Sequence, residues 1–99
     1  MCNLPSKFRI YVRALHCPTR WKILKIIGRN LRSTREIYDA LTKSGVTISM
    51  SGLYYHLSEL HRAGIIEVAE YREVGGGAPE KVWKLKKKRI VIDLLEEAE

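Results

Sequence analysis

The 99-residue sequence contains no glutamine and only two asparagines, Asn3 and Asn30, while Lys, Arg, Glu and Ile are abundant. Depletion of thermolabile amides together with many charged residues leans towards a thermophilic source. Cysteine is also scarce, because Cys2 and Cys17 are too few and too far apart for a disulfide framework or a zinc site. We therefore expect a fold that depends on its apolar core, without a metal or another cofactor.

Long apolar runs are absent as well. No stretch approaches the roughly 20 residues that a membrane-spanning helix needs, and residues 1–7 lack the apolar segment of a signal peptide. We expect a cytoplasmic protein with no membrane partner. The length predicts one domain over residues 1–99, whose core is small enough that dimerisation would help to stabilise it.

Positive charge dominates, and it is unevenly distributed. The net charge is +7: residues 1–64 contribute +8, residues 65–89 contribute +3 and residues 90–99 contribute −4. A basic body followed by an acidic tail favours a polyanionic partner for the body, most often a nucleic acid. The alternative is a basic surface that is simply solvated.

Four helices are predicted before residue 65, from apolar residues at helical spacing and from residues that start helices. The start signals are Ser6, Pro18, Ser33 with Glu36 three positions later, and either Ser49 or Ser51. The expected helices cover residues 6–15, 18–30, 33–45 and 51–64. In the second helix, Trp21 and Leu24 define an apolar face that Ile23 and Ile27 widen.

The periodicity changes after Gly64. Residues 65–74 and 80–86 alternate roughly by two and are rich in β-branched and aromatic residues, as in strands. Between them, Gly75 to Pro79 predicts a hairpin tip. Residues 90–99 return to helical spacing. The expected fold class is mainly α with a small β-hairpin (α+β), in the order α-α-α-α-β-β-α, which is the outline of a winged helix-turn-helix.

Four segments in this order resemble the ArsR-like winged helix-turn-helix transcription regulators. They are residues 14–27 with Arg20, Ile23 and Leu24, residues 33–41, residues 48–67 with His56, Leu57, Leu60 and Ala63-Gly64-Ile65, and the wing at residues 75–85. The resemblance implies a homodimer that binds double-stranded DNA. The terminal helices, about residues 6–15 and 90–99, are the expected dimer contacts, since both have more apolar surface than a small core needs.

The metal-sensing property of the ArsR-like family is not expected here. Members that sense metals carry a Cys-x-Cys pair on the first helix of the helix-turn-helix, or His and acidic ligands on the last helix. The segment REIYDAL has no cysteine and VIDLLEEAE has no histidine. A possible redox function of Cys17, which precedes the second helix, is the remaining sensory hypothesis; a small buried apolar residue is the alternative.

The helix over residues 51–64 has two different faces. Leu53, Leu57 and Leu60 share one face, and Tyr54 lies at its boundary. His56, at the edge of that face, is interpreted as a structural histidine. The opposite face carries hydroxyl groups and a cation, and in a helix-turn-helix the second helix enters the major groove.

The expected DNA-contacting residues are Arg32, Thr34, Arg35, Ser49, Ser51, Gly52, Tyr54, Tyr55, Ser58, Arg62, Arg72 and Lys81, with Arg20 and Lys43 as further phosphate contacts. Arg, Asn and Gln, the usual bidentate readers of bases, are rare among those on the helix, so we expect modest specificity. We find no nucleophile–base pair or carboxylate pair, and therefore expect no enzymatic activity. The alternative function is a winged-helix protein-interaction module of transcription or chromatin machinery.

Overall fold

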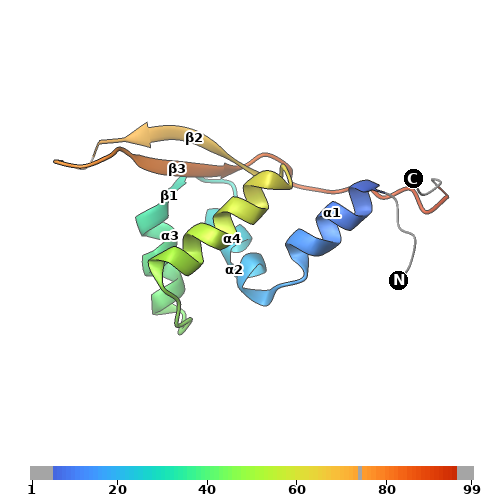
Figure 1. Cartoon of the computed structure of the whole chain (residues 1–99), viewed down its shortest axis with the longest axis horizontal. Coiled ribbons are helices and arrows are strands. Elements are labelled where there is room, and N and C mark those ends of the chain that lie inside the picture. Colours follow the sequence, from blue (N-terminus) through green and yellow to red (C-terminus); the bar gives the residue numbers. More distant parts are fainter. Residues whose placement is uncertain (1–5, 74, 96–99) are drawn as a thin grey trace.

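A computed structural model describes residues 6–73 and 75–95, and its elements follow the order of a winged helix-turn-helix (Figure 1). The helices are α1 (Ser6–Leu15), α2 (Pro18–Ile27), α3 (Thr34–Lys43) and α4 (Met50–Arg62), and the strands are β1 (Arg32–Ser33), β2 (Ile66–Arg72) and β3 (Glu80–Leu85). The expected α+β class, the four helices and the β2–β3 hairpin are confirmed.

The strands form an antiparallel sheet in the order β1-β3-β2. Ser33 of β1 pairs with Val82 of β3. An irregularity between Val68 and Glu70 leaves Ala69 unpaired, as in a β-bulge. β1 was not predicted from the sequence, because two residues are too few to show a periodicity.

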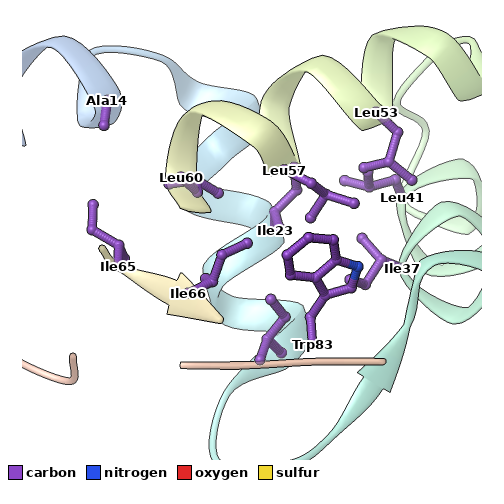
Figure 2. Packing of buried hydrophobic residues seen from close by; sticks show 11 residues of the cluster. Ala14, Ile23, Ile37, Leu41, Leu53, Leu57, Leu60, Ile65, Ile66 and Trp83 are labelled. Atoms are coloured by element: carbon purple, nitrogen blue, oxygen red, sulfur yellow. The ribbon is translucent and has the colours of Figure 1, made fainter. Parts of the chain in front are cut away.

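The core lies between α2, α3, α4 and the sheet (Figure 2). Trp83 of β3 is at its centre, and Ile23, Ile37, Leu57 and Ile66 point towards its indole ring. Leu53 and Leu60 of α4 are fully buried as well, so the apolar face predicted for this helix is confirmed.

The apolar face of α2 differs from the expected one. Ile23 and Ile27 are fully buried, but Trp21 is about half exposed, and Arg20 is buried beside Ile23. The Trp21 indole N–H donates a hydrogen bond of 2.7 Å to the backbone oxygen of Leu15, at the end of α1. Trp21 therefore faces α1 and not the core. Gly28 ends the helix with a φ of 53°, a conformation that glycine adopts without strain.

The predicted helix over residues 90–99 is wrong for residues 90–95, which contain only a turn at residues 94–95; residues 96–99 lie outside the described residues. A helix this short is marginal in water unless it packs on another surface. Val91, Leu94 and Leu95 are exposed, so this segment does not pack these apolar side chains against residues 6–73 or 75–90. The chain after β3 instead runs past α1, at the end of the molecule away from the tip of the β2–β3 hairpin (Figure 1).

Candidate nucleic-acid interface

The start of α4 presents a pair of hydroxyl groups. Ser49 is the N-cap, and its Oγ accepts a hydrogen bond of 3.0 Å from the Gly52 N–H and lies 3.1 Å from the Oγ of Ser51. Gly52 is only partly exposed, and a Cβ at this position would lie 3.2 Å from Ser49 Oγ and 3.3 Å from Ile48 Cγ1. The close packing at the start of α4 therefore explains a glycine at position 52 without any contact with DNA.

The outward face of α4 carries both tyrosines. Tyr54 is 53% exposed and Tyr55 is 59% exposed, so Tyr54 is not the boundary residue that the helical spacing predicted. Ser58 and Arg62 are exposed on the same helix. The Arg62 guanidinium forms an ion pair of 3.2 Å with Glu59, one turn earlier. This face thus combines hydroxyl groups, aromatic rings and one cation.

Arg20 was expected to contact phosphate, and the structure contradicts this. Its Nε donates a hydrogen bond of 3.0 Å to Nδ1 of His56, and only 6% of the residue is exposed. The structural interpretation of His56 is confirmed by the same bond. Burial lowers the pKa of His56 from 6.5, and the positive charge of Arg20 lowers it further.

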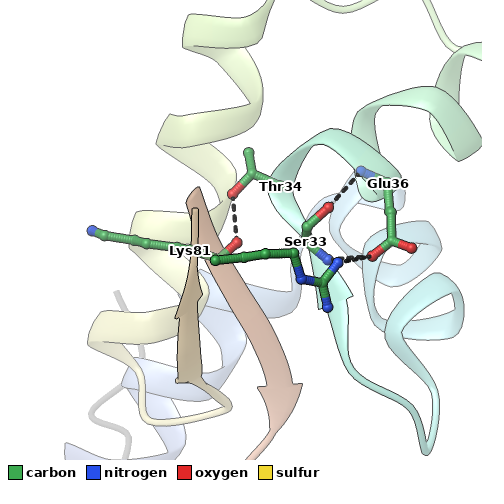
Figure 3. Close-up of polar contacts among 5 residues, drawn as sticks. Ser33, Thr34, Glu36 and Lys81 are labelled. Atoms are coloured by element: carbon green, nitrogen blue, oxygen red, sulfur yellow. Dashed lines mark hydrogen bonds and ion pairs between the residues drawn. The ribbon is translucent and has the colours of Figure 1, made fainter. Parts of the chain in front are cut away.

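The start of α3 is fixed by a reciprocal capping box, as Ser33 and Glu36 predicted. The Glu36 N–H donates to Ser33 Oγ at 3.1 Å, and the Ser33 N–H donates to the Glu36 carboxylate at 2.8 Å (Figure 3). This backbone hydrogen bond is the main reason that the pKa of Glu36 is lowered from 4.5. The carboxylate also lies 3.6 Å from the guanidinium of Arg72, at the end of β2. This ion pair links the β2–β3 hairpin to α3.

Thr34 was expected to contact DNA, but its side chain is buried. Its Oγ1 accepts a hydrogen bond of 3.0 Å from the Trp83 indole N–H. It also donates one of 3.4 Å to the Lys81 backbone oxygen (Figure 3). The hydroxyl group thus joins α3 to the core and to β3. A threonine at a helix start gives no sign of such a partner, since Trp83 is distant in sequence.

The remaining expected cations lie at or near the surface. Arg35 and Lys43 are exposed on α3, Arg32 is partly exposed on β1, and Lys81 is exposed on β3. The Arg35 guanidinium lies 6.0 Å from the ring centroid of Tyr38, and Lys81 Nζ lies 5.8 Å from that of Trp83. Tyr71, an exposed aromatic residue beside Arg72 at the end of β2, was not predicted from the sequence. Tyr71 follows the buried residues of β2, and this position is what could have indicated that its side chain is exposed.

Cys17 is the N-cap residue of α2 and is a free, partly exposed thiol; Cys2 lies outside the described residues. No group of three His, Cys, Asp or Glu side chains within residues 6–73 and 75–95 is arranged to hold a metal ion. In the same part of the chain, no helix is long and apolar enough to cross a membrane.

The fold and the exposed face of α4 define a winged helix-turn-helix protein. A family model described as a helix-turn-helix domain matches residues 14–69, and the chain belongs to this family. Comparison with curated proteins gives no match.

Solved structures of regulators share the fold. Reduced HlyU from Vibrio cholerae is 23% identical with a TM-score of 0.65, over 84% of this chain and 76% of HlyU. An ArsR family transcriptional regulator is 18% identical with a TM-score of 0.66, over 89% of this chain and 79% of its own. The ferric uptake regulator of Vibrio cholerae is 24% identical with a TM-score of 0.59; the match covers 81% of this chain but 64% of the regulator. The winged helix-turn-helix fold that the ArsR-like resemblance implied is thereby confirmed, and the helix-turn-helix family together with this fold supports a DNA-binding regulator.

Proposed function

We propose that this protein is a homodimeric transcription regulator without enzymatic activity that binds double-stranded DNA through α4 and the wing. The observation that carries the proposal is the outward face of α4, where Ser51, Tyr54, Tyr55 and Ser58 are exposed while three leucines fix the opposite face in the core. In a helix-turn-helix, such a face lies in the major groove with its N-terminal residues near the base edges.

The proposed contacts divide into two groups. Ser49, Ser51, Tyr54, Tyr55 and Ser58 offer hydroxyl groups and rings to base edges, while Arg32, Arg35, Lys43, Arg62, Arg72 and Lys81 contact phosphates. Thr34 and Arg20 are left out because they are buried. Arg62 and Arg72 have acidic partners, Glu59 and Glu36, with which phosphates must compete. We expect phosphates to supply most of the affinity, and specificity to be modest.

The proposed dimer contact is the arm, which we define as α1 together with residues 86–95. An apolar groove of about 560 Å³ lies between α1, Trp21 and residues 86–95. Its lining includes Tyr11, Val12 and Leu24. Ile10 of α1 and Val91, Leu94 and Leu95 of the second segment are exposed on the arm. A second copy related by a two-fold axis would cover these side chains and present two α4 helices to a palindromic site.

Binding to random duplex DNA over a series of salt concentrations tests the proposal. Each phosphate contact contributes about 0.9 to the log–log slope of affinity against salt. Arg62→Ala should reduce that slope and weaken binding to all sequences alike. The matched control is Lys25→Ala, which removes an exposed cation on α2. Tyr55→Ala should instead relax the base preference that selection from a random pool reveals. Absence of binding at low salt would refute the proposed function.

The second candidate is a protein-interaction module, favoured by the exposed rings of Tyr54, Tyr55 and Tyr71. Tyrosine is enriched at protein interfaces. Under this hypothesis, duplex DNA would bind weakly and without base preference, and Tyr55→Ala would leave DNA binding unchanged.

A further inference from the structure

Arg20 is a buried cation that the proposed DNA surface does not use. It lies in the first turn of α2, and its guanidinium contacts three parts of the chain: the end of α1, His56 and Tyr55. A buried guanidinium is retained only where hydrogen bonds replace its water, and these contacts supply them.

The first contact fixes α2 to α1. One terminal nitrogen of Arg20 donates to the backbone oxygens of Ala14 at 3.1 Å and Arg13 at 3.4 Å. Both oxygens belong to the last turn of α1, where carbonyl groups have no partner within the helix and a cation is favoured by the helix dipole. These two bonds tie the guanidinium to the end of α1 through backbone atoms, in addition to its contacts with α4.

The second and third contacts reach α4. Because an arginine N–H can only donate, His56 accepts through Nδ1 and carries its ring proton on Nε2 when neutral. The guanidinium carbon also lies 5.5 Å from the ring centroid of Tyr55, within the range of a cation–π contact. The His56 ring lies 5.8 Å from the Tyr55 ring. Tyr55 is exposed, but Arg20 and His56 border its ring. The Tyr54 side chain makes no hydrogen bond and no ring contact with any described residue.

We propose that Arg20 is a positioning residue: it holds the Tyr55 ring in one orientation on the outward face of α4 and thereby sharpens base discrimination, without touching DNA itself. The inference rests on the proposed function. A preorganised ring loses less conformational freedom on binding than a mobile one, and a misplaced contact discriminates poorly between bases. The same residue connects the proposed dimer arm to the proposed recognition helix.

A double-mutant cycle tests the proposal. Arg20→Met and Tyr55→Ala are made singly and together, and the affinity ratio between a selected site and the same site with one changed base pair is measured. Arg20→Met should lower this ratio by about two- to fivefold, with the salt slope unchanged. When Tyr55 is already replaced by Ala, Arg20→Met should not change the affinity ratio further, because the ring that Arg20 positions is absent.

Three results would overturn the proposal. A salt slope lowered by about one unit would show that Arg20 contacts phosphate. An equal loss of discrimination in both backgrounds would show a general structural effect of the substitution. An unchanged ratio would show that Tyr55 needs no positioning. If Arg20→Met fails to fold, Arg20→Lys, which keeps the charge but not the planar group, replaces it in the cycle.

A measurement without DNA separates this inference from the proposed function. Three-bond couplings that report χ1 should show one rotamer for Tyr55 in the wild-type protein and rotamer averaging in Arg20→Met, with Tyr54 unchanged as the internal control. A wild-type protein that binds no duplex would refute the proposed function. Tyr55 couplings that are already averaged in the wild-type protein would refute the positioning by Arg20.

Discussion

The body of the protein, from α2 to β3, and the arm are built from similar apolar residues but bury them to very different extents. Ile23, Ile27 and Leu57 of the body are 0–1% exposed, whereas Leu94 and Leu95 of the arm are 89% and 92% exposed. The body thus buries its apolar side chains in a core to which the arm adds Ala14, while Leu94 and Leu95 of the arm are exposed. Exposed apolar patches of this kind mark interaction sites.

The largest effect is expected in the body. Leu57→Ala removes a fully buried side chain beside Trp83 and should lower the free energy of unfolding by about 2–5 kcal/mol. That loss is a large part of the stability of a small domain. Chemical denaturation measures it, with Ser58→Ala, the exposed neighbour on α4, as the control that should change stability by less than about 0.5 kcal/mol. Equal effects of the two substitutions would contradict the assigned packing of α4.

The second test concerns the arm. Val12→Asp places a carboxylate in the apolar groove and should raise the dissociation constant of the proposed dimer at least about tenfold, or 1.4 kcal/mol. Sedimentation equilibrium measures the constant. Arg9→Asp, an exposed position on α1 outside the lining of that groove, is the matched control. A wild-type chain that remains monomeric at high concentration would remove the proposed role of the arm.

The third effect is smaller and lies at the start of α3. Ser33→Ala removes the hydroxyl group that accepts the Glu36 N–H and should cost about 1 kcal/mol of stability. Ser58→Ala again serves as the exposed control. A substitution at Ser33 without effect would mean that the Glu36 carboxylate alone fixes the start of α3.

Local signals predicted most of the fold. Ser33 with Glu36 located the start of α3, Pro18 the first turn of α2, and the glycine-rich segment the end of the β2–β3 hairpin. Where a residue type and its spacing suffice to define a conformation, the sequence is informative, because the cause lies within a few neighbouring positions.

Two of the corrected predictions, those for Arg20 and Thr34, depend on partners in other elements of the fold. Arg20 is buried because α1 supplies carbonyl groups and α4 supplies His56. Thr34 is buried because Trp83, 49 residues further on, donates to its hydroxyl group. No periodicity in a helix reveals such partners, so both residues resembled surface residues. The expected helix at residues 90–95 is wrong for the opposite reason: Val91, Leu94 and Leu95 are exposed, and a short helix that packs on no other surface is marginal in water.

The smallest expected effect is on the pH dependence of stability. It arises at His56 of α4, whose partner Arg20 also contacts α1 of the arm. Because burial and the charge of Arg20 lower the pKa of His56 below 6.5, the folded state binds a proton at this ring less readily than the unfolded chain does. The contribution of His56 to stability is therefore fully present above about pH 6.5. It is lost as the pH falls through the lowered pKa, where protonation of Nδ1 breaks the bond from Arg20.

Two measurements check the sign of this effect. The His56 ring, followed by NMR, should titrate below 6.5, and in Arg20→Met its pKa should move upwards because a repelling charge is removed, while burial still opposes protonation. Between pH 7 and pH 5 the wild-type protein should lose more stability than Arg20→Met. A steeper loss in Arg20→Met would mean that other groups govern the pH dependence, and that the Arg20–His56 contact connects the arm to α4 without responding to protons.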